Sequence, residues 1–384
     1  MKQLVIAGGG FAGIWGAMAA AATRDRVGAD VEISLISRDD ALCIRPRLYE
    51  GALAEALVPI KPLMDVIGVQ FVHAKLSDIQ QSSVVADNRN YAFDAMLFCL
   101  GSQMYFPQIP GAEKLGFSID DYFETQRLDA HLRSLEQNDE DPTTIMVVGA
   151  SFTGIELVTR LRMRLGENVR LILVDREAKP GANLGSNLTG EIRSALDVAN
   201  VEFLAETSLK RVTPEGVVLS DGSEIATRTV VFATGITASP LASHLSGNVE
   251  SDGRIAVDQM LRVPGKTNLF AAGDVARAQT DEQNSTLMSC QHAMPMGAAA
   301  GQNAVLALSG NDLRPYAQPF YATCIDLGPA GAVFTTGWDR RIDKKNAEGA
   351  AMKSEINTKW IYPPAPELGR ESIFAQIEAS LNDS

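Results

Sequence analysis

The hydrophobic pattern begins with two short apolar segments, residues 4–7 and 145–148, and each runs directly into a glycine-rich turn. Short apolar runs bounded by turn signals are typical of buried parallel strands. The alanine-rich residues 17–22, which follow the first turn, favour a helix. The pattern therefore predicts two strand–turn–helix units that lie far apart in the sequence.

The spacing within these turns is typical of dinucleotide-binding sites. The turn positions are Gly8, Gly10 and Gly13 in the first unit, and Gly149, Ser151 and Gly154 in the second. The first position allows the tight turn, the second lets a pyrophosphate approach the backbone, and the third lets the helix pack against the strand. The phosphates then lie at a helix N-terminus, which favours negative charge. A serine at the second position still permits close approach, and the alternative is an ordinary turn whose glycines serve packing alone.

Later apolar segments repeat this layout in both halves of the chain. Residues 31–36 and 171–174 fit the second strand of each unit, and residues 91–101 and 229–235 each fit a strand that runs into a glycine loop. We therefore predict an internal duplication of one nucleotide-binding unit, with a period far longer than that of a solenoid. Two bound dinucleotides in one chain indicate a redox enzyme that passes hydride from one to the other.

The residue that ends the second strand normally holds the adenosine ribose through a carboxylate. In the first unit Ser37 and Arg38 stand there, and Asp39 follows as a displaced carboxylate or a solvated loop charge. In the second unit Asp175 ends the strand at a spacing that fits a ribose contact and favours NADH. Arg176 beside it could instead meet a 2′-phosphate, so the choice between NADH and NADPH stays open.

Composition narrows the class of protein. The chain of 384 residues is long enough for two or three domains, and its net charge of −13 argues against a nucleic-acid partner. No apolar run reaches the roughly 18 residues that a membrane span needs, and the N-terminus leads directly into a strand, so we expect no signal peptide. The four cysteines have no metal-binding spacing, which predicts a cytoplasmic protein with no metal site.

These motifs, with a strand that ends on Gly273–Asp274 and the loop at Gly235, resemble those of the pyridine nucleotide-disulfide oxidoreductase superfamily over roughly residues 1–310. The resemblance implies an α/β fold with two interleaved Rossmann-like domains and a small C-terminal α+β interface domain. The FAD-binding domain would comprise residues 1–112 and 265–312, the NAD(P)H-binding domain residues 113–264, and the interface domain residues 313–384.

The resemblance also implies the cofactors, which are non-covalent FAD and either NADH or NADPH as hydride donor. Asp274 would bind the ribityl chain of FAD. The residues expected to contact the two cofactors are Gly8, Gly10, Phe11, Ala12, Gly13, Ser37, Arg38, Arg45, Leu76, Gly101, Gly273, Asp274, Gln291, Gly149, Ser151, Thr153, Gly154, Asp175, Arg176 and Gly235.

Local motifs indicate which branch of the superfamily the chain resembles. The chain lacks the CxxxxC pair of the disulfide reductases, and Cys43 fits a small buried apolar residue better than a flavin-linked thiol. Residues 44–50 resemble the flavin-side loop of type II NADH dehydrogenases and, nearly as well, that of ferredoxin-type reductases. Arg45 and Arg47 would then be positive groups near the flavin or surface arginines at a helix start.

Residues 289–297 resemble the helix start that faces the flavin in type II NADH dehydrogenases. Gln291 matches that motif, whereas Pro295 replaces a glutamine that lines the quinone site in the family. That replacement argues against a ubiquinone-like acceptor. His292 falls at the expected flavin edge, as a proton relay or simply as a helix-start histidine. Glu156 lies where the family places the nicotinamide, so Glu156, Gln291, His292 and Arg45 are the catalytic candidates.

The sequence thus predicts an FAD-dependent NAD(P)H oxidoreductase whose acceptor is a quinone-like or specialised small molecule. Two alternatives stay open: a ferredoxin- or rubredoxin-type reductase that feeds an iron–sulfur partner protein, and a slow NADH-binding redox-sensing scaffold. A net charge of −13 does not favour the basic docking face that an iron–sulfur partner needs. The last helix, predicted over residues 371–381, is acidic with one modest apolar stripe, which suits a core or homodimer contact better than a membrane anchor.

Overall fold

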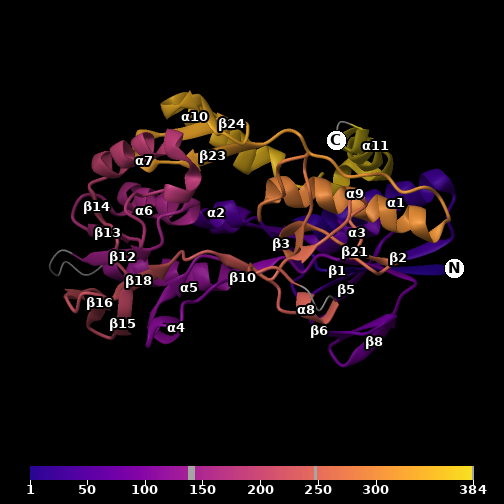
Figure 1. Cartoon of the computed structure of the whole chain (residues 1–384), viewed down its shortest axis with the longest axis horizontal. Coiled ribbons are helices and arrows are strands. Elements are labelled where there is room, and N and C mark those ends of the chain that lie inside the picture. The colour runs from indigo at the N-terminus through magenta and orange to yellow at the C-terminus, as the bar shows by residue number, and fades with distance from the viewer. Residues whose placement is uncertain (137–142, 246–248, 383–384) are drawn as a thin grey trace.

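The computed structural model describes residues 1–136, 143–245 and 249–382, and it forms two lobes bridged by a C-terminal module (Figure 1). The first lobe contains a five-stranded parallel sheet of order β21-β9-β1-β2-β5. Its strands are β21 (Leu269–Ala271), β9 (Ala95–Phe98), β1 (Lys2–Ala7), β2 (Val31–Ser37) and β5 (Gln70–His73).

The second lobe repeats this arrangement. Its five-stranded parallel sheet has the order β11-β18-β12-β13-β14, so the strand that carries the glycine turn is central in both sheets. The strands are β11 (Phe117–Ser118), β18 (Thr229–Phe232), β12 (Thr144–Val148), β13 (Arg170–Val174) and β14 (Val201–Leu204). The internal duplication expected from the sequence is therefore visible in the strand order.

Each lobe also carries a three-stranded antiparallel meander at the corresponding place in the chain. These are β6 (Leu76–Ile79), β7 (Ser83–Ala86) and β8 (Arg89–Ala92) in the first lobe, and β15 (Leu209–Thr213), β16 (Gly216–Leu219) and β17 (Glu224–Ala226) in the second. The chain passes between the lobes through the antiparallel pair β10 (Ser102–Met104) and β19 (Ile236–Ala238). Because β21 returns to the first sheet after the second lobe is complete, the two lobes are interleaved.

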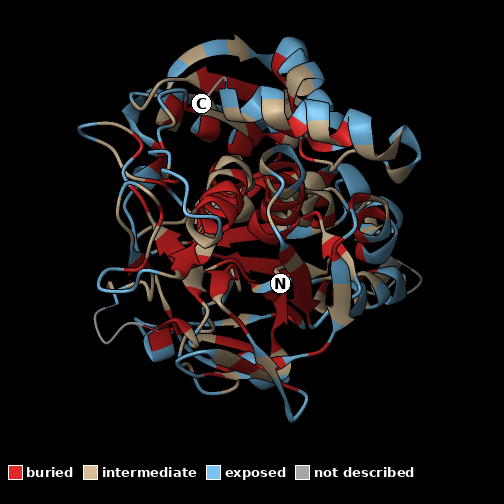
Figure 2. Ribbon diagram, turned by 90° about the vertical axis from the view of Figure 1, so that its right-hand side faces the viewer, coloured by how far each residue is buried: buried red, intermediate tan, exposed pale blue. Residues whose placement is uncertain are grey.

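Helices cover the sheets and separate them from solvent (Figures 1 and 2). On the first lobe α1 (Phe11–Val27) and α9 (Cys290–Leu308) cross at backbone contact: a Cβ on Gly297 would lie 2.1 Å from the Ala12 carbonyl oxygen, and one on Gly301 2.1 Å from that of Gly16. Only glycine permits this approach. On the second lobe α6 (Phe152–Leu165) and α7 (Ser186–Val198) lie on one face of the sheet and α5 (Tyr122–Glu136) on the other.

The C-terminal module joins the lobes. Its antiparallel sheet of β23 (Ala322–Asp326), β24 (Ala332–Thr336) and β25 (Arg341–Lys345) packs on α6 and α7, followed by α10 (Asn346–Glu355) and a π-helix (Ile356–Trp360). The last helix, α11 (Gly369–Asn382), returns to pack on α1, and it buries Ile373 and Ile377 in the core of the first lobe. The apolar stripe of this helix is thus a core contact. None of the helices in the described ranges is long and apolar enough to cross a membrane.

The shorter elements complete the chain. They are β3 (Ala41–Cys43), α2 (Arg45–Tyr49), η1 (Leu53–Glu55), β4 (Leu57–Pro59), α3 (Ile60–Ile67), α4 (Ala112–Leu115), η2 (Ala182–Leu184), α8 (Ala242–Leu245), β20 (Ile255–Ala256), η3 (Gly273–Val275), β22 (Ala276–Arg277), η4 (Gly328–Ala330) and η6 (Pro366–Leu368).

Candidate functional site

The first glycine turn has the geometry of a phosphate cradle. Gly8 has a φ of +118°, and a Cβ there would lie 2.3 Å from the Cys99 carbonyl oxygen. A Cβ on Gly13 would lie 1.8 Å from the Gly8 carbonyl oxygen, so α1 packs directly against the turn. By contrast, nothing lies within 4 Å of a Cβ built on Gly10, the N-cap of α1. The turn therefore leaves open space at the helix N-terminus, where an anion is favoured.

The second turn repeats this geometry almost atom for atom. A Cβ on Gly149, at φ +108°, would lie 2.3 Å from the Ala233 carbonyl oxygen, and one on Gly154 would lie 1.8 Å from the Gly149 carbonyl oxygen. Ser151 is the N-cap of α6, and its side chain caps no backbone N–H of the helix. Its Oγ accepts a hydrogen bond from Asn183 Nδ2 at 3.2 Å. The serine therefore keeps the N-terminus of α6 free.

The two lobes differ in the residues at the end of the second strand, where the adenosine ribose is expected to bind. In the first lobe the side chain of Ser37 is buried beside the turn, and Arg38 and Asp39 form an exposed ion pair with each other at 2.8 Å. In the second lobe Asp175 accepts the Ala150 N–H at 2.5 Å through Oδ2 and the Glu177 N–H at 2.9 Å through Oδ1.

Asp175 thus fixes the glycine turn to the end of β13, whereas the neighbouring Arg176 is exposed.

Arg45 and Asp274, both predicted at the flavin, lie in one polar network with two residues that the sequence did not single out. Ser102 Oγ donates to Asp274 Oδ2 at 2.6 Å, and Arg45 donates to Ser102 Oγ at 2.9 Å and to the Ser102 carbonyl oxygen at 2.7 Å. Arg45 Nη1 also lies 3.5 Å from Asp120 Oδ1 and 3.9 Å from Asp274 Oδ2. Gly273 packs against Ala12 of α1. The Gly273–Asp274 motif, α2 and β10 therefore meet beside the first turn.

The remaining predicted cofactor contacts lie in loops after strands or at the starts of elements. Gly101 (φ +64°) and Gly235 (φ +97°) follow β9 and β18, and a Cβ on either would have no atom within 4 Å. Leu76 is buried at the start of β6, and Phe11 begins α1 with its ring 5.9 Å from that of Trp15.

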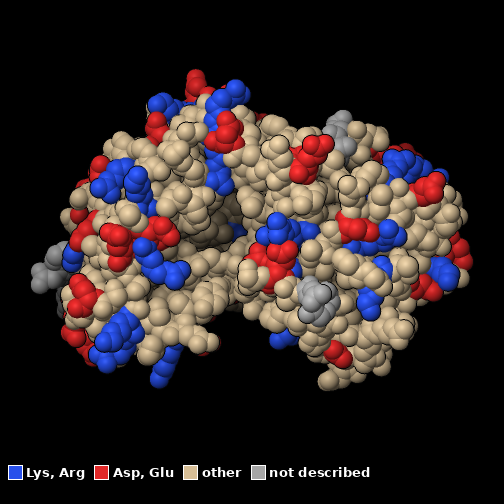
Figure 3. Space-filling model, in the orientation of Figure 1, with Lys and Arg blue, Asp and Glu red and all other residues tan. Residues whose placement is uncertain are grey.

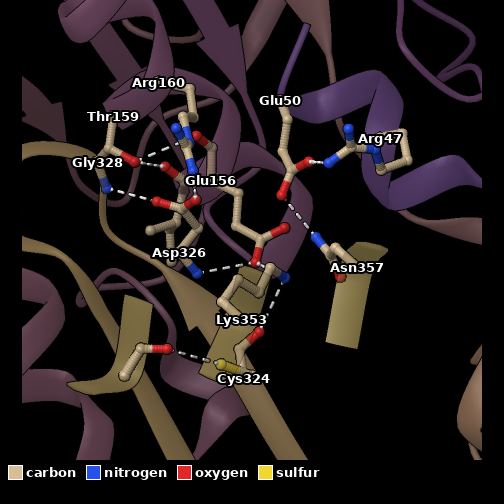
Figure 4. Close-up of polar contacts among 12 residues, drawn as sticks. Arg47, Glu50, Glu156, Thr159, Arg160, Cys324, Asp326, Gly328, Lys353 and Asn357 are labelled. Carbon is tan, nitrogen blue, oxygen red and sulfur yellow. Dashed lines mark hydrogen bonds and ion pairs between the residues drawn. The ribbon is translucent and has the colours of Figure 1, made fainter. Parts of the chain in front are cut away.

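Glu156 forms the most deeply buried ion pair of the candidate site, and its partner comes from the C-terminal module (Figure 4). Lys353 Nζ lies 2.6 Å from Glu156 Oε1, which also accepts the Asp326 N–H at 2.9 Å. Lys353 Nζ donates further to the Cys324 carbonyl oxygen at 3.0 Å, and Arg160 pairs with the Asp326 carboxylate. Burial raises the pKa of Glu156 although Lys353 opposes it, and Glu156 holds the pKa of Lys353 above its usual value despite burial.

The π-helix adds a second polar contact one turn beyond Lys353. Asn357 is buried and donates to Glu50 Oε1 at 2.7 Å, and Arg47 Nη1 lies 2.5 Å from Glu50 Oε2 (Figure 4). The guanidinium of Arg47 is therefore held by Glu50. Beside it, burial raises the pKa of the Tyr49 hydroxyl to about 12, and that hydroxyl contacts Thr153 of the second glycine turn. Lys353 and Asn357 thus attach the C-terminal module to both lobes at once.

The start of α9 is held by backbone contacts around Gln291. Pro295 lacks the N–H that would bond to the Gln291 carbonyl oxygen, and Gln318 Nε2 donates to that carbonyl instead, at 3.1 Å. The Gln291 side-chain amide lies against the backbone of Ala322, and its surroundings assign its orientation: the nitrogen faces the Ala322 carbonyl oxygen at 2.8 Å and the oxygen faces the Ala322 N–H at 3.1 Å.

His292 is buried, and its Nδ1 lies 2.8 Å from Gln318 Oε1. Its Nε2 is buried with no hydrogen-bond partner, and burial lowers the pKa of the ring. The imidazole stacks on Tyr321 and Trp338, with ring centres 5.7 and 5.8 Å away.

None of the four thiols is activated. Burial raises the pKa of Cys43 and Cys290 to about 11 and that of Cys324 to about 12, and it raises the pKa of Cys99 as well. All four cysteines are free. Thiolate chemistry at neutral pH is therefore disfavoured, and the described residues contain no cluster of His, Cys, Asp and Glu that could hold a metal.

The surface is hollowed between the two lobes, beneath the C-terminal module (Figure 3). A cavity of about 230 Å³ lies at one side of this junction, between α2, α5 and α6, and its lining includes six leucines together with Tyr49, Glu50 and Arg160. No residue of either glycine turn lines this cavity. The residues that sequence reasoning missed, namely Ser102, Asp120, Asp326, Lys353 and Asn357, belong to no local motif and are brought to the site by the tertiary fold.

Comparison with known proteins identifies the family. The model of the pyridine nucleotide-disulphide oxidoreductase family matches residues 2–297. The chain is 36% identical to an NADH dehydrogenase-like protein of Mycobacterium tuberculosis over 95% of both chains. It is 27% identical to a demethylphylloquinone reductase of Synechocystis, over 87% of this chain and 86% of the relative. Among solved structures, NDH2 from Plasmodium falciparum in complex with NADH superposes with a TM-score of 0.77 at 11% identity, over 100% of this chain and 98% of the other.

The chain therefore belongs to the pyridine nucleotide-disulphide oxidoreductase family, and it is an FAD-dependent NAD(P)H oxidoreductase. The expected α/β fold with two dinucleotide-binding units is confirmed. The domain boundaries at residues 112/113, 264/265 and 312/313 and the roles of the individual site residues stay predictions.

Proposed function

We propose that this protein oxidises NADH at the second glycine turn and passes the electrons, through FAD at the first turn, to a small quinone-type acceptor. The observation that carries the proposal is the buried Glu156–Lys353 pair, 2.6 Å apart, at the junction of the two lobes and the C-terminal module. It gives a buried charged pair whose carboxylate lies on α6, directly after the second glycine turn.

The residues at the first turn fit FAD. The free N-terminus of α1 and the open space at Gly10 suit a diphosphate, and Asp274 offers a carboxylate to a polyol chain. FAD bound there supplies two-electron chemistry, taking hydride from the nicotinamide and giving electrons to the acceptor. Arg45 holds Ser102 and Asp274 in place. It also puts a positive charge in the segment of residues 44–50, which resembles a flavin-side loop.

The residues at the second turn fit NADH. The N-terminus of α6 takes the diphosphate, and Asp175 presents a carboxylate at the end of β13, where it disfavours a 2′-phosphate. A site that held the nicotinamide against the flavin ring would accelerate the reaction mainly through proximity, because the entropic cost of the encounter would be met on binding.

Side chains of this protein can carry out the proton transfer that quinone reduction requires. Reduction of a quinone to the quinol takes two electrons and two protons, of which NADH supplies two electrons and one proton. The second proton must come from the protein or the solvent. The Glu156 carboxyl, whose pKa is raised by burial, can hold and pass this proton, while Lys353 stays protonated as its counter-charge.

The acceptor contact differs from the one implied for type II NADH dehydrogenases. Pro295 has no hydrogen-bonding side chain, and the Gln291 amide is engaged with Ala322. A site that lacks these donors loses discrimination for a quinone that needs them. We therefore propose a quinone other than ubiquinone. The relative named as a demethylphylloquinone reductase supports a quinone, and the mixed charges on the face in Figure 3 do not resemble a basic docking surface for ferredoxin.

The test is steady-state NADH oxidation by the purified, FAD-loaded protein with a short-chain naphthoquinone, a long-chain ubiquinone in lipid, and ferredoxin. We expect the highest kcat/KM with the short-chain quinone. Pro295→Gln should raise turnover of the long-chain quinone, and Pro295→Ala, which restores the N–H without the side chain, should not. Faster turnover of ferredoxin, or efficient wild-type turnover of long-chain quinone, would contradict the proposed acceptor.

A further inference from the structure

Arg340 extends from the turn between β24 and β25 onto the second lobe. Its Nη1 donates to the Asn183 carbonyl oxygen at 3.1 Å and its Nη2 to the Tyr321 hydroxyl at 3.3 Å. The guanidinium carbon lies 5.6 Å from the centre of the Phe152 ring. Arg340 also has a φ of +52°, which is uncommon for a residue with a side chain. The hairpin therefore places a cation against the first residue of α6.

The charge of Arg340 is not balanced locally. In the part of the chain that the structure describes, no carboxylate forms an ion pair with this guanidinium, whereas Arg160 on the neighbouring α6 pairs with Asp326. Its Nε is buried with no hydrogen-bond partner, and so is Nε1 of Trp338 on the same turn. Unpaired buried donors are unfavourable, so the contacts that the protein itself makes leave part of the hydrogen-bonding capacity of this hairpin turn unused.

The guanidinium of Arg340 lies near the second glycine turn, to which Asn183 connects it. Asn183 accepts from Arg340 through its carbonyl oxygen and donates through its side chain to Ser151 Oγ, the N-cap of α6. One residue thus links Arg340 to the middle position of the second glycine turn. The first turn of α6 contains no basic residue of its own, so a cation from elsewhere would add to the helix N-terminus in binding an anion.

We propose that Arg340 forms an anion subsite for the diphosphate of the nicotinamide nucleotide, supplied by the C-terminal module. The inference rests on the proposed function and deepens it, because it assigns a binding role to a module that lies outside both dinucleotide-binding lobes. Arginine suits this role, since its planar donors match phosphate oxygens. A 2′-phosphate would offer the same chemistry, but the link through Asn183 leads to Ser151 at the helix N-terminus, where the diphosphate lies.

The experiment is calorimetric binding of NAD⁺ and NADP⁺ to the FAD-loaded protein. Arg340→Gln, which removes the charge and keeps donors for Asn183, should weaken both nucleotides roughly tenfold or more, reduce the salt dependence of binding, and leave FAD content unchanged. Arg340→Lys should recover part of the affinity. Arg341→Gln is the matched control, because Arg341 is exposed on the same hairpin, and it should change nothing.

A second control separates charge from hairpin position. Asn187 Nδ2 donates to the Asp339 carbonyl oxygen at 2.9 Å. Asn187→Ala therefore removes one hydrogen bond that holds the hairpin and leaves Arg340 unchanged. An equal loss of affinity in Asn187→Ala, or wild-type affinity in Arg340→Gln, would overturn the proposal. A loss confined to NADP⁺ would overturn the diphosphate assignment in favour of the 2′-phosphate. A wild-type protein that binds neither nucleotide would instead contradict the proposed function itself.

Discussion

Lys353 Nζ lies 2.6 Å from Glu156 Oε1, and both side chains are buried. Lys353 belongs to the C-terminal module and Glu156 to the helix that follows the second glycine turn. The pair therefore ties the position of the module to the electrostatics of the site. A buried pair of this kind contributes little net stability, but either charge left alone is costly.

Glu156→Gln should affect only one of the two half-reactions, which are flavin reduction by NADH and flavin reoxidation by a quinone. The amide can still accept from the Asp326 N–H, but it cannot carry a proton. We expect flavin reduction by NADH to keep its rate, while reoxidation by a quinone slows about 100-fold. Stopped-flow measurement of each half-reaction checks this. Asp326→Asn, which alters the neighbouring pair with Arg160, is the control, and an equal effect in that variant would remove the proton role of Glu156.

Lys353→Met should destabilise the protein, because it leaves the Glu156 carboxylate buried without its counter-charge. We expect a loss of about 3–5 kcal/mol in the free energy of unfolding, measured by urea denaturation. Lys344→Met removes a lysine whose ion pair with Asp343 is largely exposed, and it should cost less than about 1 kcal/mol. Similar losses in the two variants would mean that the Glu156–Lys353 pair is not the dominant contact of the module.

The fold could be predicted because its signals are local. Gly13 and Gly154 are required by contacts within one strand–turn–helix unit, with the carbonyl oxygens of Gly8 and Gly149, and the same spacing occurs twice. The helix start expected within residues 289–297 is found at Cys290, the first residue of α9.

The site could be predicted only in part. Arg45, Asp274 and Glu156 sit in motifs with recognisable neighbours. Lys353 reaches Glu156 across 197 positions of sequence, and its helix has no motif that marks it. Likewise, Gln318 replaces the hydrogen bond that Pro295 removes, but nothing near Gln318 in the sequence indicates this. Contacts of this kind depend on how the C-terminal module packs, which periodicity does not encode.

The reactivity of Cys43 tests whether a thiolate takes part in the reaction. Burial raises the pKa of its thiol to about 11. A raised pKa means that the neutral thiol persists through neutral pH and the thiolate forms only as the pH rises through about 11. We expect alkylation of Cys43, followed by peptide mass spectrometry, to accelerate only at high pH, and Cys43→Ser to retain activity. Rapid alkylation at pH 7, or a visible thiolate–flavin charge-transfer band, would contradict this account.

Variants of Asp175 test whether the protein prefers NADH or NADPH as its hydride donor. Its carboxylate ends β13 and holds the Ala150 and Glu177 N–H groups, so a 2′-phosphate placed there meets a like charge. The wild type should show a higher kcat/KM for NADH than for NADPH, and Asp175→Asn should shift the ratio towards NADPH by about tenfold or more. If the wild type uses NADPH equally well and Arg176→Ala abolishes that use, Arg176 rather than Asp175 sets the preference.

The central claim is that hydride passes from NADH to FAD within this chain, and anaerobic titration of the purified protein with NADH tests it most directly. We expect yellow protein whose visible flavin absorbance bleaches fully with about one equivalent of NADH and returns on addition of a short-chain quinone. Asp274→Ala should retain less FAD but still fold. A wild-type protein that takes up no added FAD, or a bound flavin that NADH does not reduce, would contradict the account.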